Sequence, residues 1–286
     1  MDDLQLSLFL LICLSIISWW IAPRWVAAIG AALSAGYAYW LGYVDGLGLL
    51  VLAGIGLMLR GYYTVYKLPE LPKLALAIVL IGATFTVYLH YMPGFYNFMA
   101  ANQIRLSPAS SPYTAYVNID KALVGLIFLL YFPAFNRSLK EWLHSARFIP
   151  LPLLIVSLLL IGSAYAINYI QFDPKVPSIL WWWIPLNLLF VCVAEEVFYR
   201  GFIQRELSNA LSNYKYGQMS AIILTAIICG AAHYRGGISF VFLSGLAAII
   251  YGYVFVKSQR LETSILIHFF VNLIHILTFS YPSLSR

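Results

Sequence analysis

Long apolar runs separated by short polar segments occur along the whole chain. A helix that crosses a bilayer needs about 20 mostly apolar residues, and its backbone groups must all be hydrogen-bonded within the protein. The sequence therefore predicts an all-α fold, a polytopic transmembrane helical bundle of about eight to ten spans. The runs lie at residues 4–22, 25–43, 46–59, 73–92, 121–135, 149–170, 178–212, 217–234, 238–256 and 262–281.

The composition agrees with a membrane protein and argues against a nucleic-acid partner. The chain is 62% hydrophobic and 10% charged, whereas soluble domains carry about 25% charged residues. Its net charge is +6, but the basic residues lie in short loops between apolar runs. Most of them follow odd-numbered runs, which places those loops in the cytoplasm by the positive-inside rule. We expect an integral membrane protein, surrounded by the lipid bilayer of a prokaryotic plasma membrane.

Three other features of the sequence have simple interpretations. The first apolar run has no basic residues before it and no clear cleavage site, so we expect a retained helix. The cysteines at positions 13, 192 and 229 all lie in apolar runs without metal-ligand spacing, so we expect small core residues. The long segment 93–120 is expected to be a connecting loop, with a lid or a substrate dock as the alternative.

Two adjacent acidic residues, Glu195 and Glu196, lie inside the seventh apolar run. A carboxylate in hydrocarbon costs at least a few kcal/mol, so such a pair suggests chemistry. On a regular helix neighbours point about 100° apart, and Glu196 and Arg200 at i,i+4 share one face. We therefore predict an ion pair between Glu196 and Arg200 that leaves Glu195 to face another partner. The structural alternative is an ion pair that only fixes helix packing.

His233 ends the next apolar run, and we predict that it meets Glu195. If the two helices turn back near residues 212–216, both side chains lie roughly 25 Å from the turn. Small residues beside His233, beginning with Gly230, would allow close backbone approach. The last run places His268 and Asn272 on one helix face, where both can donate hydrogen bonds to an oxyanion. His275 shares this face, and for it we favour a structural hydrogen bond.

Taken together, these motifs resemble a known family over roughly residues 180–280. The pattern is similar to that of the CPBP family of intramembrane proteases, which includes the CAAX prenyl protease of the Rce1 type and the Abi proteins. One position departs from the usual family pattern, because Cys229 stands where a phenylalanine is common. The residues that carry the resemblance are Glu195, Glu196, Arg200, His233, His268 and Asn272.

The resemblance implies a glutamate-dependent endopeptidase that hydrolyses a peptide bond of a membrane-associated protein or peptide. Glu195 and His233 would activate water, while His268 and Asn272 would stabilise the oxyanion. Glu196 and Arg200 would support the site. The resemblance also divides the chain into an N-terminal transmembrane region, 1–147, of about five subfamily-specific spans, and a catalytic transmembrane core, 148–286.

Two alternatives stay open at the level of sequence. Two histidines and a glutamate can bind zinc, but the H-E-x-x-H spacing is absent and the family works without metal, so we expect no cofactor. The same polar residues would also suit a transporter or a non-enzymatic membrane scaffold. Transport favours a string of polar residues across the bilayer, for which the first six runs offer mainly His90.

Overall fold

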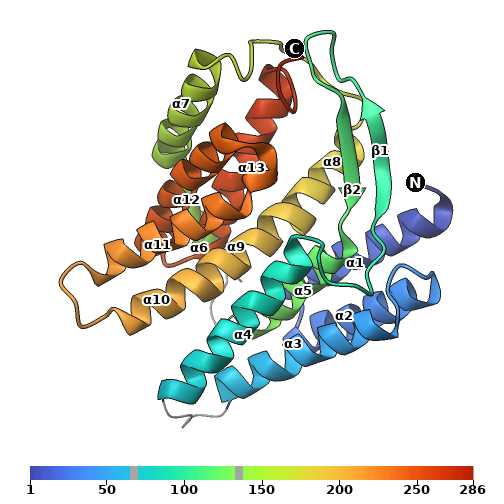
Figure 1. Cartoon of the computed structure of the whole chain (residues 1–286), viewed down its shortest axis with the longest axis vertical. Helices are drawn as coiled ribbons and strands as arrows, with labels where there is room; N and C mark the ends of the chain where they lie inside the picture. Colours follow the sequence, from blue (N-terminus) through green and yellow to red (C-terminus); the bar gives the residue numbers. More distant parts are fainter. Residues whose placement is uncertain (65–69, 133–137, 286) are drawn as a thin grey trace. The chain divides into compact units, whose positions relative to one another are not determined.

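The computed structural model describes residues 1–64, 70–132 and 138–285 of the chain (Figure 1). It is 73% helical with almost no sheet, which confirms the predicted all-α class. Each of the ten apolar runs contains helix, although residues 133–135 of the fifth run lie outside the described part. The helices are α1 (Asp3–Ile21), α2 (Arg24–Trp40), α3 (Gly46–Thr64), α4 (Glu70–Tyr88), α5 (Ile119–Tyr131), α6 (Leu139–Ala146), α7 (Pro150–Ala166), α8 (Leu180–Pro185), α9 (Ala194–Phe198), α10 (Arg205–Ala210), α11 (Gly217–Ala232), α12 (Ile238–Ser258) and α13 (Leu261–Thr278).

Six helices in the described part of the chain are long and apolar enough to cross a membrane. They are α1, α3, α4, α12, α13 and one continuous helix over Leu180–Ala210. The pair α6 and α7, bent by 42°, brings the number to seven if it forms one broken span. The chain is therefore an integral membrane protein with several spans.

The helix over Leu180–Ala210 changes its winding twice. It passes from α8 through a π-helical segment, Leu186–Val193, to α9, and then through a second π segment, Tyr199–Gln204, to α10. The first π segment begins directly after Pro185. Proline has no N–H for the helical ladder, and a wider turn is one way to absorb that loss. Residues on this helix are consequently not all related by regular α-helical spacing.

The segment 93–120 is not wholly a loop. It contains strands β1 (Phe98–Ile104) and β2 (Tyr113–Val117), which pair as a two-stranded sheet. The prediction of a plain connecting loop is wrong for these residues. Strand β2 consists largely of aromatic and β-branched residues, which favour strands, but it is too short to stand out between the apolar runs.

The chain forms two compact units that alternate along the sequence. The first consists of residues 1–100, 116–133 and 189–197, and the second consists of residues 101–115, 134–188 and 198–286. In the first unit α5 packs against α1, α2, α3 and α4. In the second α12 packs against α7, α11 and α13 around a core that includes Val156, Tyr251 and Ile267. The predicted boundary after residue 147 separates an N-terminal region from the family-like core, and it stays a prediction.

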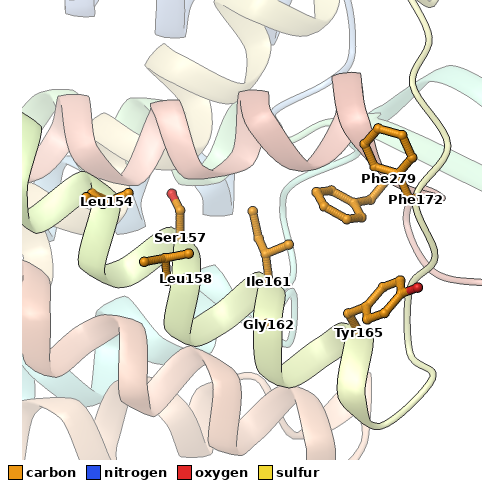
Figure 2. A pocket seen from close by; sticks show the side chains of 8 residues that line it. All are labelled: Leu154, Ser157, Leu158, Ile161, Gly162, Tyr165, Phe172 and Phe279. Carbon is orange, nitrogen blue, oxygen red and sulfur yellow. The ribbon is translucent and has the colours of Figure 1, made fainter.

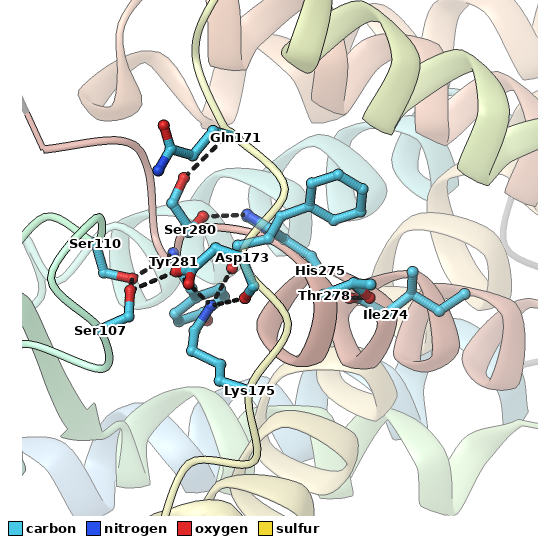
Figure 3. Close-up of polar contacts among 11 residues, drawn as sticks. Ser107, Ser110, Gln171, Asp173, Lys175, Ile274, His275, Thr278, Ser280 and Tyr281 are labelled. Carbon is cyan, nitrogen blue, oxygen red and sulfur yellow. Dashed lines mark hydrogen bonds and ion pairs between the residues drawn. The ribbon is translucent and has the colours of Figure 1, made fainter.

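In the second unit, the chain end after α13 is held by two distant segments (Figure 3). The Lys175 ammonium group donates to the Phe279 carbonyl oxygen and lies 3.2 Å from the Asp173 carboxylate. The Ser107 hydroxyl donates to the same carboxylate, and the Tyr281 N–H donates to the Ser110 hydroxyl at 3.0 Å. This network fixes the end of α13, the helix that carries His268 and Asn272.

Candidate active site

Within the first unit, the Glu195 carboxylate forms an ion pair with Lys121. The Lys121 Nζ atom lies 2.5 Å from Glu195 Oε1, and both side chains are nearly buried. Lys121 lies in the first turn of α5, whereas Glu195 lies in α9. The sequence analysis did not identify Lys121 as a partner. The available signal was a lysine directly before a long apolar run.

Close backbone contact brings α5 and α9 together. The Tyr88 hydroxyl donates to the Ala194 carbonyl oxygen at 2.9 Å. A Cβ atom added at Gly125 would lie 2.7 Å from the Ala194 Cβ atom, so only glycine allows this approach. The Lys121 ammonium group also lies 5.3 Å from the centre of the Tyr88 ring. The glutamate-bearing segment is therefore held in place by α4 and α5.

An acidic residue next to Lys121 in the sequence, Asp120, pairs with a histidine. The Asp120 carboxylate lies 2.7 Å from His90 Nδ1 and accepts a hydrogen bond from the Lys121 backbone N–H. The Asn97 side chain contacts His90 Nδ1 at 3.3 Å and accepts a hydrogen bond from the Ile119 N–H. Asp120 is thus committed to His90 and to the N-terminus of α5, whose N–H groups favour an anion.

Glu196 and Arg200 are both fully shielded from solvent, with 1% and 0% of their surfaces exposed. Glu196 belongs to the part of the long helix in the first unit, and Arg200 to the part in the second. The residues between them cross the change from α-helix to π-helix at Tyr199. The predicted Glu196–Arg200 ion pair assumed a regular helix, and it stays a prediction.

In the second unit, Tyr251 links Arg200 to His268. The Arg200 guanidinium carbon lies 5.7 Å from the centre of the Tyr251 ring. The His268 ring stacks on the same tyrosine, with centroids 5.0 Å apart and an angle of 21° between the planes. The Ser264 hydroxyl donates to the Tyr251 carbonyl oxygen. Two predicted site residues therefore share one aromatic neighbour, which the sequence analysis missed.

Asn272 lies one turn after His268 on α13, as the spacing predicted. Its side-chain N–H donates to the side-chain Oδ1 atom of Asn187 at 3.2 Å, so the amide is oriented by a residue of the long helix. His275, a further turn along, contacts the Ser280 carbonyl oxygen at 3.2 Å and the Tyr281 ring. This contact agrees with a structural role for His275, although its hydrogen-bond partner lies just beyond its own helix.

His233 caps the C-terminal end of α11. Its Nδ1 atom lies 2.7 Å from the Cys229 carbonyl oxygen. A carbonyl can only accept, so Nδ1 carries the proton and, in the neutral ring, Nε2 is the basic nitrogen. The ring also packs against Phe240 at 5.4 Å. Position 229, where the chain departs from the family pattern, supports His233 through its backbone.

Gly230 allows a close helix contact, as expected, but its partner is α12. A Cβ atom at this position would lie 2.8 Å from the Val241 carbonyl oxygen and 3.2 Å from the Gly245 Cα atom. The expected turn between the two helices lies between Ala210 and Gly217. The predicted Glu195–His233 pair joins residues of different units and stays a prediction.

An apolar groove of about 440 Å³ lies along α7 in the second unit (Figure 2). Its lining contains no acidic, basic or histidine side chain, so it offers no group for hydrolysis. Its lining residues are Leu154, Ser157, Leu158, Ile161, Gly162, Tyr165, Phe172 and Phe279. We regard it as an apolar surface of the membrane-embedded unit.

The described residues, 1–64, 70–132 and 138–285, contain no cluster of side chains that is arranged to bind a metal ion. No three His, Cys, Asp or Glu side chains in these ranges are grouped so that they could hold an ion. His268 is stacked on Tyr251, and His233 Nδ1 is engaged with a carbonyl. The expectation of a reaction without a metal stays a prediction that a metal analysis has to test.

The fold and these side chains define a class, namely a helical membrane protein with buried acidic and basic residues and partly buried histidines among its apolar helices. Residues 176–274 match the family described as type II CAAX prenyl endopeptidase Rce1-like. The match confirms the resemblance predicted from the motifs, and it contains every predicted site residue. No curated protein and no solved structure significantly matches the chain.

Proposed function

We propose that this protein is an intramembrane endopeptidase that uses Glu195 and His233 to hydrolyse a peptide bond. The observation that carries the proposal is the Rce1-like match over residues 176–274, which includes both residues in the expected order. The buried Glu195 carboxylate and the basic Nε2 nitrogen of His233 provide the groups that proton transfer requires. The prokaryotic plasma membrane is the proposed location.

In the proposed reaction, Glu195 accepts a proton from water as the water oxygen bonds to the peptide carbonyl carbon. The carbonyl oxygen becomes an oxyanion, which the Asn272 amide and a protonated ring nitrogen of His268 stabilise by hydrogen bonds. The C–N bond then breaks, and the proton passes to the leaving amine with the help of His233. Glu196 and Arg200 hold the helix that carries Glu195 in place.

The substrate class follows from the setting of the site. Glu195, Glu196 and Arg200 lie on a helix that is long and apolar enough to cross a membrane, so we expect the substrate to be embedded in the membrane or attached to it. The matched family is described as a CAAX prenyl endopeptidase. A peptide with a prenylated C-terminal cysteine motif is therefore the first substrate to test, beside the same peptide without the prenyl group.

The test compares protein termini in cells that express the wild-type chain, Glu195→Ala, His233→Ala or the control Glu206→Ala. Glu206 lies on the same long helix and pairs with its neighbour Arg205, so it controls for the loss of a glutamate. New termini should occur with the wild type and the control and be absent with the other two variants. Retention of the same termini in both site variants would reject the proposal.

A metal analysis of the purified protein tests the zinc alternative. We expect cleavage of the identified substrate to continue in the presence of a chelator. Stoichiometric zinc together with loss of cleavage on chelation would replace the glutamate mechanism with a metal-dependent one.

A further inference from the structure

We propose that Lys121 is a positioning residue for Glu195, whose ammonium group pairs with the carboxylate and holds it in the orientation needed for proton transfer. This inference rests on the proposed function and adds a residue outside the matched region, which begins at residue 176. The only premise taken from that function is that Glu195 acts as the base.

The contact itself is short and shielded. Lys121 Nζ lies 2.5 Å from Glu195 Oε1, with 13% and 9% of the two side chains exposed. Burial of a carboxylate in an apolar setting without a partner is costly. An ammonium group at contact distance offsets this cost.

The position of Lys121 on α5 is unfavourable unless it has such a partner. It lies in the first turn of the helix, where the helix dipole favours anions and disfavours cations. Asp120 gives that end its negative charge and is itself engaged with His90. Glu195 is then the acidic residue that the Lys121 ammonium group contacts, with the Tyr88 ring 5.3 Å away as a further favourable surface.

The packing of the surrounding helices fixes the geometry of the contact between Lys121 and Glu195. The Tyr88 hydroxyl is bound to the Ala194 carbonyl oxygen, one residue before Glu195. Gly125, one turn after Lys121 on α5, allows the helix backbone to approach Ala194. The packed helices therefore set the distance between the Lys121 ammonium group and the Glu195 carboxylate.

The test replaces Lys121 by Met, Arg and Ala in the full-length protein and measures cleavage of the substrate identified above. We expect Lys121→Met to lower kcat by roughly 100-fold, in the range of acid–base effects, with little change in KM. Lys121→Arg should recover most of the loss. For Lys121→Ala, added propylamine should raise kcat, whereas propanol, which has the same size but no charge, should not.

Lys73→Met is the matched control, because the Lys73 ammonium group lies 5.2 Å from the Tyr62 ring in the same unit. It loses the same kind of aromatic contact and should cleave like the wild type. Thermal unfolding of Lys121→Met, Glu195→Gln and the double variant gives a readout independent of activity. The two effects should be non-additive, because each single change removes the same ion pair.

The outcomes separate the two proposals. Cleavage by Glu195→Gln at the wild-type rate would reject Glu195 as the base and with it the proposed function. An inactive Glu195→Gln beside a Lys121→Met that keeps the wild-type kcat would reject only the role of Lys121. Equal rescue by propylamine and propanol, or additive unfolding effects, would also reject that role, because a filled space and not a charge would then matter.

Discussion

At the scale of single residues, charged groups on and beside the apolar helices are engaged with specific neighbours. Lys121 pairs with Glu195, Asp120 pairs with His90, and the Arg200 guanidinium lies over the Tyr251 ring. Buried charges are retained in membranes when each is compensated by a partner. These contacts explain how charged side chains are stabilised among apolar helices. They also identify residues that support the proposed reacting groups.

Tyr251 provides the first residue-scale prediction. Its ring contacts both His268 and Arg200. Tyr251→Leu removes the ring and should lower kcat by about 10-fold, since an aromatic contact is worth roughly 0.5–1.5 kcal/mol. Tyr251→Phe keeps the ring and should retain more activity than the Leu variant. The measurement is kcat for the substrate identified by the terminus comparison. Equal activity of the Phe and Leu variants would show that the stacking does not orient His268.

At the scale of helices, the positions of the polar residues depend on close backbone approach and on irregular winding. Gly125 allows α5 to contact Ala194 of α9, and Gly230 allows α11 to contact α12. Two π-helical segments flank α9, the short helix that carries Glu195. π-Helical turns occur frequently at functional sites. These irregular turns change which neighbours the glutamates face.

Gly125→Ala tests the approach of α5 to α9. The added Cβ atom would lie 2.7 Å from the Ala194 Cβ atom, so we expect a loss of stability of about 1–3 kcal/mol from overpacking. Gly54→Ala is the matched control, because a Cβ atom at this position in α3 meets nothing within 4 Å. The midpoint of thermal unfolding in detergent should fall for Gly125→Ala only. Equal midpoints would show that the two helices can separate without cost.

At the scale of the whole molecule, segments far apart in the sequence combine to hold the end of α13, the helix that carries His268 and Asn272. The second unit brings together residues near 107–110, 171–175 and 279–281 (Figure 3). Lys175 and Asp173 form the charged centre of this network. Their effect on His268 and Asn272 is indirect, through the position of the helix end.

Lys175→Met should destabilise the protein, because it leaves the Asp173 carboxylate and the Phe279 carbonyl oxygen without this donor. Removing one partner of a shielded ion pair costs roughly 3–5 kcal/mol, and the Lys175 side chain is only 10% exposed. Lys215→Met is the control, because Lys215 is exposed. Hydrogen exchange of the α13 amides near Thr278 should accelerate in the first variant alone. Unchanged exchange would mean that the helix end is held by other contacts.

The sequence alone determined the class of fold and the identity of the candidate site residues. Apolar runs of bilayer length permit only helices, because the bilayer offers no water to satisfy backbone groups. Acidic residues and histidines inside such runs stand out, since their burial is costly. These two facts predicted the helices and selected Glu195, His233 and His268, whereas Asn272 was selected because it shares a helix face with His268. The short strands escaped detection because their pattern covers few residues.

Only the tertiary structure decided which neighbours these residues meet. Lys121 lies 74 positions before its partner Glu195 in the sequence. Tyr251 lies 17 positions before His268, and Asn187 lies 85 positions before Asn272. No local spacing rule connects such positions, because helix periodicity relates only residues within a few turns. The contacts depend on how helices approach, on glycines such as Gly125 and on the winding change after Pro185. Local sequence therefore determined which groups are candidates for chemistry, and packing between helices determined their partners.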